Sequence, residues 1–392
     1  PASMADIIES TLSLTRKILN KDQIQIETDI ASDLPKVKCR SQQIMQVLMN
    51  LLTNGRDALN QKFTGYDEDK IIRVGIIGLG VMGQRMLTNM QGHASFEVTA
   101  AWDPLAEACT AAQGAAPGLN IVASAAELIA SDITDLIYIA CPPHWHREYA
   151  DLAMDAGKPV YCEKPLGIDL ADSEAFVARL EETGTKNIVN FAQSQCRAVA
   201  EIERAIKSGE IGSISGLDAI VHFSNWPRDW QADADWLRYR DQGGYTREVF
   251  SHFIYVIERL MGRAELISST PVYQDDPALC ETHISAVLDC SHKDASVPIT
   301  LMGSSGGVGP DRVELTLWGD KKSYRLHDWF NLQISDGDEW QSQFTDVPDL
   351  RVDSFARQLD GVAVWMRGEN NSLASAQDAL SVQRLIEEML QG

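Results

Sequence analysis

The sequence of 392 residues predicts an α/β protein in which a doubly wound parallel sheet is followed by a strand-rich domain. Two patterns indicate this fold class. Over residues 71–191, buried apolar strands alternate with helices, which is typical of a parallel sheet covered by helices on both faces. Later segments show the alternation or β-branched enrichment of strands, and helices near 350–367 and 374–390 finish the chain. These predicted strands are residues 214–224, 264–273, 282–291, 297–303, 312–318 and 323–335.

Composition narrows the classes of function. The chain carries 34 Lys and Arg against 56 Asp and Glu, a net charge of −22, which argues against nucleic acid or anionic membranes as partners because phosphate binding needs clustered basic residues. No apolar run approaches the roughly 18 residues of a membrane span, and no signal peptide pattern opens the chain. The seven cysteines are widely spaced without a C-x-x-C pair, so neither a disulfide framework nor a metal site is expected. The sequence therefore predicts a soluble, cytoplasmic protein.

Residues 1–70 differ from the rest in charge and pattern. They hold only −1 of the net charge, and a polar turn at residues 64–70 marks the predicted boundary. Ser3 and Asp6 predict a helix start, residues 23–30 alternate like a strand, and a second apolar helical stripe follows.

That second helix, residues 46–59, resembles the N-box of sensor histidine kinase ATP-binding domains, where the asparagine matching Asn54 helps hold magnesium on ATP. The D-x-G-x-G and lid loops that this fold needs do not follow it. We therefore expect a truncated kinase-like fragment, a fusion or a tag without ATPase activity, and Pro1-Ala2-Ser3 before Met4 favours an artificial join. An ATP-binding signalling protein is the alternative.

A glycine motif opens the second part. Residues 71–77 form a buried strand that runs into Gly78-x-Gly80-x-x-Gly83, and a helix begins at Val81 and Met82. Gly78 permits a tight turn, Gly80 lets the backbone approach a pyrophosphate, and Gly83 allows close packing of helix on strand. The free N–H groups of the helix start then face the phosphates. The pattern predicts a dinucleotide site.

Asp103 ends the next predicted strand, residues 96–102, twenty residues after Gly83. A carboxylate in this place accepts hydrogen bonds from the ribose hydroxyls and repels a 2′-phosphate, which favours NAD over NADP. No arginine follows closely to bind such a phosphate, although NADP stays possible. The alternative for Asp103 is a plain turn residue before Pro104.

Two further strand ends carry polar groups. Residues 136–140 are followed by Cys141, Pro142 and His146, and residues 159–162 by Glu163, Lys164 and Pro165. Ligands bind at the carboxyl ends of such strands, so Lys164 is placed to stabilise a developing alkoxide or to act as an acid–base group. Taken alone, Lys164 would more often be a solvated surface lysine.

The run Ala156–Pro165 resembles the A-G-K-x-V-x-x-E-K-P signature of the Gfo/Idh/MocA oxidoreductase family, and His146 falls where that family has a P-x-x-x-H histidine. The resemblance implies a Rossmann domain at 71–195, then an α+β domain for substrate binding and oligomerisation at 196–392. That domain would hold an open, mostly antiparallel sheet, covered by a second subunit in a homodimer or homotetramer. Lys164 would be catalytic beside the nicotinamide, and its neighbours would line the cofactor pocket: Cys141, Pro142, His146, Glu163 and Pro165.

A third family signature, G-G-x-x-x-D-x-x-x-H-x-x-D, corresponds to residues 243–255. Glu248, His252 and Tyr255 are spaced to share one helical face. His252 matches the family histidine, which serves as the general base or acid. Glu248 replaces the first aspartate and Tyr255 the last, so Tyr255 becomes a candidate substrate contact together with Tyr245.

Between the two halves lies an aromatic, charged loop at residues 223–240. Trp226 can stack on a sugar ring, and Arg228 or Arg240 can hold a carboxylate, although the loop is equally suited to a lid or a subunit interface. Arg197 lies near the position where the family often has a pocket arginine.

These residues predict an NAD(P)-dependent oxidoreductase that moves a hydride between nicotinamide and a hydroxyl-bearing carbon of a sugar, cyclitol or related polyol. In this scheme Lys164 polarises the oxygen, His252 exchanges its proton and Glu248 orients His252. Two alternatives stay open: a reductase of a carbonyl or imine substrate, and a dinucleotide-binding sensor of the same fold without turnover.

Overall fold

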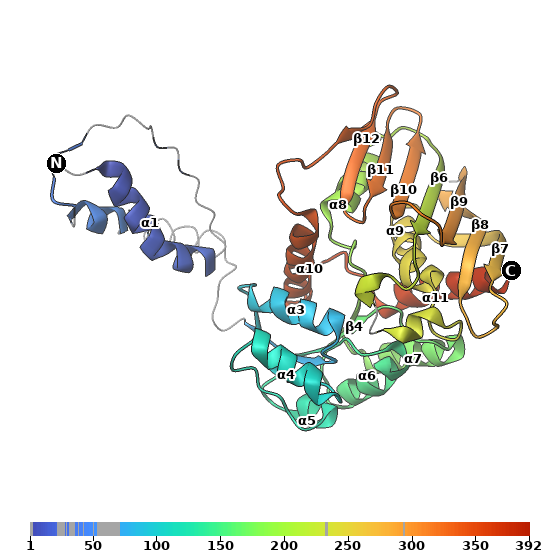
Figure 1. Ribbon diagram of the computed structural model, residues 1–392, viewed down its shortest axis with the longest axis horizontal. Helices are drawn as coiled ribbons and strands as arrows, with labels where there is room; N and C mark the ends of the chain where they lie inside the picture. The colour runs from blue at the N-terminus through green and yellow to red at the C-terminus, as the bar shows by residue number, and fades with distance from the viewer. Residues whose placement is uncertain are drawn as a thin grey trace. The chain divides into compact units, whose positions relative to one another are not determined.

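The computed structural model describes residues 3–21, 28, 30, 36, 37, 39–41, 43–49, 51, 52, 71–231, 234–292 and 295–392. Its internal contacts divide the chain into two compact units, residues 1–72 with 90–97 and residues 73–89 with 98–392. Figure 1 shows the described helices and strands. None of the described helices is both long and apolar enough to cross a membrane.

The N-terminal segment begins with the predicted helix. Helix α1 spans Met4–Lys21, and the Asp6 N–H donates to Ser3 Oγ at 3.3 Å, the contact that caps a helix start. Leu12 of its apolar stripe is buried. Asn54 of the predicted kinase-like helix lies outside the described residues.

The predicted parallel sheet is confirmed. Five strands lie in the order β2-β1-β3-β4-β5, and the pairs β1–β3, β3–β4 and β4–β5 are parallel. Strands β3 and β4 are buried at every residue, as expected where helices cover both faces. The strands are β1 (Ile72–Ile77), β2 (Phe96–Trp102), β3 (Leu136–Ile139), β4 (Val160–Glu163) and β5 (Asn187–Asn190). The connecting helices are α3 (Val81–Gln91), α4 (Ala106–Ala115), α5 (Ala125–Ala130), the 3-10 turn η2 (Pro143–Trp145), α6 (His146–Asp155) and α7 (Leu170–Thr183).

The second sheet has eight strands in the order β13-β12-β11-β10-β6-β9-β8-β7. Its described pairs are antiparallel except β6–β9, which agrees with the expected mostly antiparallel sheet. The strands are β6 (Ile214–Phe223), β7 (Ala264–Tyr273), β8 (Glu281–His292), β9 (Ala295–Ser305), β10 (Arg312–Gly319), β11 (Ser323–His327), β12 (Asn331–Ser335) and β13 (Gln341–Ser342).

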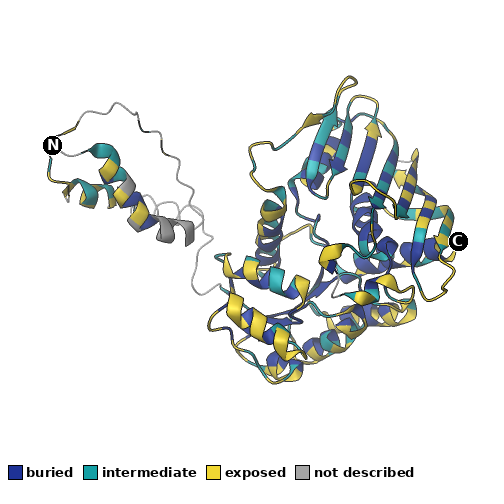
Figure 2. Ribbon diagram, in the orientation of Figure 1, coloured by how far each residue is buried: buried dark blue, intermediate teal, exposed yellow. Residues whose placement is uncertain are grey.

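Helices cover one face of this sheet. Residues along β8 and β9 alternate between buried and exposed, so one face meets the core and the other faces outward (Figure 2). The buried face contacts α8 (Arg197–Ser208), α9 (Ser251–Met261) and α11 (Ala376–Gln391), and α11 also contacts β5 and α7 of the first domain. The remaining elements are the 3-10 turns η3 (Asp229–Gln231) and η4 (Asp235–Arg238), the π-helical turn η5 (Thr246–Phe250) and α10 (Leu350–Met366).

One sequence prediction is corrected here. The predicted strand 323–335 is two strands, β11 and β12, joined by a turn at residues 328–330. The two strands pair with each other, so that Leu326 lies opposite Leu332. The turn matters because it carries Trp329 into the candidate site.

Candidate active site

The glycine motif has the geometry that a dinucleotide requires. Gly78 adopts φ +94°, and a Cβ there would lie 2.7 Å from the Cys141 backbone nitrogen. A Cβ on Gly83 would lie 1.9 Å from the Gly78 carbonyl oxygen, so α3 packs directly on the loop. A Cβ on Gly80 would meet nothing within 4 Å. The space beside Gly80 is therefore open to a pyrophosphate, and these residues fit the cofactor that the sequence predicts.

Asp103 is held next to this loop. Its Oδ2 accepts from the Leu79 N–H at 2.7 Å, and its Oδ1 accepts from the Leu105 N–H at 2.8 Å. The two bonds fix the carboxylate at the end of β2. Each oxygen retains a lone pair, so the group remains able to accept ribose hydroxyls.

His146, which we expected to contact the cofactor, joins two loops of the site. The ring is buried, with Nδ1 2.9 Å from the Pro165 carbonyl oxygen and Nε2 2.9 Å from the Cys141 carbonyl oxygen. Burial lowers the pKa of His146 to about 4, so the ring is neutral and donates its single N–H to one of the two carbonyls. His146 thereby links the loops that follow β3 and β4.

Glu163 lies within a buried polar network that the sequence did not reveal. Its Oε1 accepts from the Tyr138 hydroxyl and from Asn190 Nδ2 at 2.6 Å, while the Tyr161 hydroxyl donates to Asn190 Oδ1 at 2.7 Å. Burial raises the pKa of Glu163. The network joins β3, β4 and β5 at their carboxyl ends and fixes the backbone from which Lys164 projects.

Lys164 and Glu248 form the ion pair at the centre of the site. Lys164 Nζ donates to the Glu248 carboxylate and also to the Glu248 carbonyl oxygen at 3.1 Å. The side chains are only 8% and 19% exposed, respectively. Lys164 follows β4 of the first domain and Glu248 belongs to the second, so the pair joins the two domains at the carboxyl edge of the parallel sheet.

The pairing of Glu248 differs from the sequence prediction. We expected Glu248 to orient His252, since residues i and i+4 share a face of an α-helix. Residues Thr246–Phe250 instead form a π-helical turn before α9 begins at Ser251. Bonds from i to i+5 widen the turn and rotate Glu248 relative to the following residues. The Glu248 carboxylate therefore meets Lys164, and the buried Nδ1 of His252 has no hydrogen-bond partner among the described residues.

His252 lies among aromatic rings and cations. Phe191 and Trp329 meet its ring edge to face, with centroids 5.8 and 5.7 Å away. Burial, and then the charges of Lys164 and Arg228, lower its pKa well below the usual value. The imidazole is therefore neutral, with a lone pair on one ring nitrogen, and the same surroundings make it a weaker base.

Trp329 is a site residue that the sequence analysis missed. It lies in the turn between β11 and β12, where Asp328 has φ +46° and Trp329 has φ +76°. Such angles are uncommon for residues other than glycine and concentrate at functional sites. The one available signal was Asp328, a turn-forming residue inside an apolar alternation.

Arg228 is surrounded by four aromatic rings. Its guanidinium carbon lies 4.9 Å from the centroid of Phe223, and the other three rings are those of Trp226 at 5.7 Å, Trp230 at 4.7 Å and Trp329 at 5.5 Å. Trp226 donates its indole N–H to the Leu237 carbonyl at 3.0 Å, which fixes the loop. Trp226 thus packs on Arg228 within the loop.

The other predicted substrate contacts have partners within the protein. Arg197 makes a bidentate ion pair with Asp353, both bonds being 2.8 Å. Tyr255 stacks on Phe191 at 4.5 Å, and its hydroxyl donates to the Ser372 carbonyl at 3.3 Å. Tyr245 is fully buried, and its hydroxyl has no partner among the described residues. Arg240 lies over the ring of Tyr273 at 3.7 Å.

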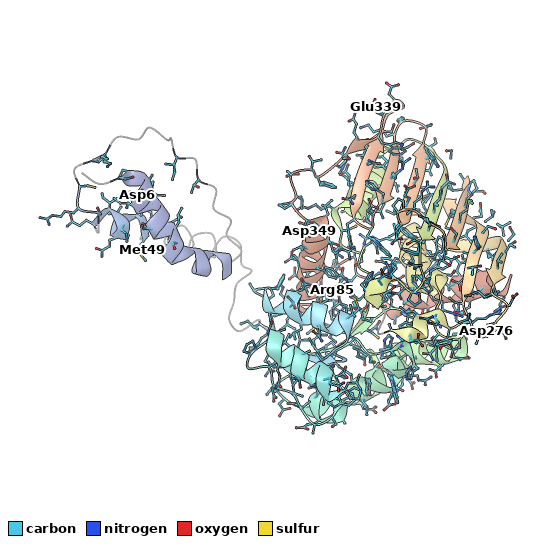
Figure 3. All side chains as sticks on the ribbon, in the orientation of Figure 1. Asp6, Met49, Arg85, Asp276, Glu339 and Asp349 are labelled. Atoms are coloured by element: carbon cyan, nitrogen blue, oxygen red, sulfur yellow. The ribbon has the colours of Figure 1, made fainter. Side chains whose placement is uncertain are left out.

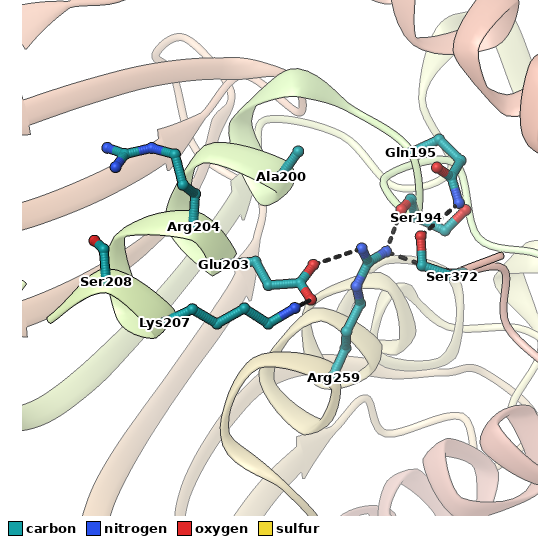
Figure 4. Close-up of a pocket in the computed structure, with 9 residues that line it drawn as sticks. All are labelled: Ser194, Gln195, Ala200, Glu203, Arg204, Lys207, Ser208, Arg259 and Ser372. Atoms are coloured by element: carbon teal, nitrogen blue, oxygen red, sulfur yellow. Dashed lines mark hydrogen bonds and ion pairs between the residues drawn. The ribbon is translucent and has the colours of Figure 1, made fainter. Parts of the chain in front are cut away.

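A separate surface groove contains none of the motif residues. It has a volume of about 570 Å³ and lies along α8 (Figure 4). Its cations are already neutralised, because Arg259 and Lys207 both pair with Glu203, and Arg204 pairs with Glu201 and Glu210. We therefore place the candidate active site around Lys164 and not in this groove.

Curated relatives align with part of the chain. A D-apiose dehydrogenase of Paraburkholderia graminis is 26% identical over 251 residues, which cover 61% of this chain and 66% of the relative. An inositol 2-dehydrogenase of Corynebacterium glutamicum is 30% identical over 147 residues, 37% of this chain and 44% of the relative. The chain thus spans about half to two thirds of the length of these relatives.

Solved structures share the fold. The WlbA dehydrogenase of Bordetella pertussis, in complex with NADH and UDP-GlcNAcA, has a TM-score of 0.69 at 20% identity and covers 83% of this chain and 97% of its own. An oxidoreductase of Agrobacterium radiobacter, in complex with NAD⁺, L-tartaric acid and magnesium, has a TM-score of 0.69 at 15% identity and covers 82% and 97%. Residues 72–191 match the sequence model of the Gfo/Idh/MocA oxidoreductase family with an NAD-binding Rossmann fold.

Proposed function

We propose that residues 71–392 form an NAD-dependent oxidoreductase that transfers a hydride between nicotinamide and a hydroxyl-bearing carbon of a polyol. The observation that carries the proposal is the buried Lys164–Glu248 pair, at the carboxyl edge of the parallel sheet that also carries the glycine motif. A lysine ion-paired in this place supports stabilisation of negative charge on a substrate oxygen.

Glu248 and His252 have separate roles in the proposed reaction. Glu248 fixes the Lys164 ammonium by its carboxylate and its carbonyl, so that few rearrangements are needed as charge develops. Neutral His252 accepts the hydroxyl proton when the alcohol is oxidised and returns it in the reverse direction. The bound nicotinamide supplies the hydride chemistry. Glu248 acts here through Lys164 and not through His252.

The names of the relatives support a polyol as the substrate class. They are an inositol dehydrogenase and an apiose dehydrogenase, so each name specifies a polyhydroxylated substrate. Asp103, held beside the glycine loop, supports NAD over NADP as the cofactor. A carbonyl or imine substrate would use the same groups in the reductive direction.

The outer face of the second sheet supports self-association. Val272, Val287 and Met302 are exposed apolar side chains on β7, β8 and β9, and Trp318 on β10 extends the same face. Apolar side chains exposed on one face of a sheet can contribute to a protein interface. We propose that a second copy of the chain covers this face in a homodimer or homotetramer.

The test is a screen of sugars, inositols and 2-hydroxy acids with NAD⁺ and separately with NADP⁺, with wild type and Lys164→Ala side by side. We expect turnover with at least one polyol, a preference for NAD⁺, and loss of turnover in the variant. Nucleotide binding without turnover of any substrate in either direction would favour the sensor alternative. Turnover that survives in Lys164→Ala would contradict the mechanism.

Residues 1–70 are proposed to take no part in the reaction. Deleting them is expected to leave kcat/KM unchanged, and magnesium-dependent ATP binding by the full chain would contradict the view that they are an inactive kinase-like fragment.

A further inference from the structure

Three arginines from distant parts of the chain gather beside the proposed catalytic groups. Arg85 lies on α3, Arg228 in the loop before η3, and Arg351 in the first turn of α10. Arg85 and Arg228 share one aromatic ring, since their guanidinium carbons lie 5.7 and 4.7 Å from the centroid of Trp230. Arg85 is also 5.8 Å from the ring of Phe355 on α10. Figure 3 labels Arg85 on α3 and Asp349, which precedes α10.

This arginine cluster carries uncompensated charge. Most described arginines of this acidic chain form ion pairs, yet none of the three in the cluster pairs with a described carboxylate. Arg228 donates to the amide oxygen of Gln231 at 2.9 Å, and the guanidinium of Arg351 lies over the ring of Phe330 at 5.5 Å. Rings and an amide leave the net charge of the cluster at three positive units.

The nearby carboxylates are engaged elsewhere. Glu248 pairs with Lys164, Asp349 caps the start of α10, and Asp311 accepts from the Ser224 N–H at 3.3 Å. Burial and the neighbouring arginines lower the pKa of the Arg228 guanidinium, and burial and Arg85 lower that of Arg351. Bringing like charges together costs free energy, and binding an anion offsets that cost.

The cluster adjoins the reacting position. Arg228 and His252 lie against the same ring, because the Trp329 centroid is 5.5 Å from the Arg228 guanidinium carbon and 5.7 Å from the His252 ring. An anionic group on Arg228 would thus be one indole away from the proposed proton acceptor.

We propose that the substrate is an acidic polyol, one that bears a carboxylate or a phosphate, and that Arg228 binds this oxyanion with Arg85 and Arg351 beside it. Guanidinium groups suit both oxyanions because their planar fork donates two parallel hydrogen bonds. The inference rests on the proposed oxidoreductase function and specifies its substrate class.

Matched substrate pairs test the proposal. D-gluconate is compared with D-glucitol, and myo-inositol 1-phosphate with myo-inositol, by the ratio of kcat/KM for the acidic member to that for the neutral member with NAD⁺. We expect wild type to prefer the acidic member of at least one pair by tenfold or more, and the pair that responds distinguishes carboxylate from phosphate. The KM of the acidic substrate should rise with added salt.

Single variants connect the preference to the cluster. Arg228→Gln is expected to lower the ratio by at least about tenfold through KM, as for loss of a charge-assisted hydrogen bond. Arg351→Gln, which replaces a guanidinium packed over the Phe330 ring, is expected to lower it severalfold. Arg384→Gln is the control: it removes one positive charge from an exposed arginine of α11 that pairs with Glu174, and should leave the ratio unchanged.

The outcomes separate this inference from the proposed function. Preferred turnover of neutral polyols, with ratios that no arginine variant changes, would overturn the inference and leave the oxidoreductase standing. Weaker NAD⁺ binding in Arg228→Gln and Arg351→Gln, without a change in the ratio, would assign the cluster to the cofactor phosphates and also overturn it. If no substrate is turned over, the binding of D-gluconate and myo-inositol 1-phosphate to the NAD⁺-loaded protein is measured by calorimetry. Binding to wild type that is lost in Arg351→Gln would support the oxyanion site. Absence of binding to wild type would refute it.

Discussion

The Lys164–Glu248 pair gives the sharpest test of how the site works. Glu248→Gln keeps the size of the side chain and removes its charge. The backbone carbonyl of residue 248 remains an acceptor for Lys164 at 3.1 Å. Lys164 is only 8% exposed, so water cannot fully replace the lost carboxylate. The variant therefore leaves a largely buried ammonium with two neutral oxygen acceptors, the side-chain amide of the introduced glutamine and the backbone carbonyl, and without its counter-charge.

The expected loss of stability lies between two limits. Exposed ion pairs contribute about 0.2–1 kcal/mol, while removing one partner of a fully buried pair costs about 3–5 kcal/mol. The partial exposure of Glu248 and the remaining carbonyl place the expected decrease in the free energy of unfolding at about 1–3 kcal/mol. Urea unfolding followed by tryptophan fluorescence measures it. Glu201→Gln, which breaks an exposed pair with Arg204, is the control and should match wild type within error.

Turnover then distinguishes the two roles considered for Glu248. We compare kcat/KM for Glu248→Gln, Lys164→Met and the double variant. If Glu248 acts through Lys164, its replacement has no further effect once Lys164 is gone, and the double variant equals Lys164→Met. Losses that add on a logarithmic scale would refute this reasoning and assign Glu248 to another group, such as His252.

Three further predictions concern the loop, the fold and the sheet. Gly83→Ala places a Cβ 1.9 Å from a carbonyl oxygen and should lower both the Tm and the affinity for NAD⁺. In Gly80→Ala the added Cβ meets no protein atom within 4 Å, so this variant should lower only the affinity for NAD⁺. Equal losses of Tm in the two variants would contradict the steric argument. Burial lowers the pKa of His146 to about 4 in the folded protein. As the pH falls, His146 is therefore protonated in the unfolded chain before it is protonated in the folded protein, and the free energy of unfolding decreases below about pH 6.5. Between pH 7 and pH 5, urea unfolding should show wild type losing about 2 kcal/mol more than His146→Gln, and equal losses would count against a neutral buried ring. Met302→Asp on the exposed sheet face should reduce the mass measured by light scattering to that of a smaller assembly, and an unchanged mass would exclude this face as the interface.

The parallel sheet could be predicted because each of its strands is marked by residues close together in the sequence. Each strand is a short apolar run, and the glycine motif fixes where the first strand ends and the first helix begins. The requirement for glycine at residues 78 and 83 then follows from sterics alone, since a Cβ at either position would collide with backbone atoms. Lys164 could be predicted for the same reason as the strands, since it directly follows a strand end.

The turn at residues 328–330 could not be predicted from periodicity. Tyr324, Leu326, Phe330, Leu332 and Ile334 all occupy even positions, so the alternation of period two continues through the turn without a break in phase. A hairpin with a three-residue turn retains this phase, and one long strand would show the same pattern. Only pairing between the two strands, which is not local, separates the alternatives.

The π-helical turn escaped prediction for a related reason. The spacing of Glu248, His252 and Tyr255 satisfies an α-helix, and one wider turn leaves no mark on the apolar pattern. In this turn the Glu248 carboxylate meets Lys164. The partner across the domain boundary, more than eighty residues earlier in the chain, stabilises the outcome.

The charges around His252 constrain one another. Lys164 and Arg228 both lie close enough to lower the pKa of His252, so an imidazolium in this place would be a third cation. Glu248 neutralises Lys164, and aromatic rings surround Arg228 without neutralising it. The imidazole consequently stays neutral, while Arg228 has no carboxylate partner among the described residues and can pair with an anion. A protein carboxylate paired with Arg228 would favour protonation of His252 and would also occupy the proposed anion site. The neutral state of His252 and the open anion site therefore both depend on Arg228 having no such partner.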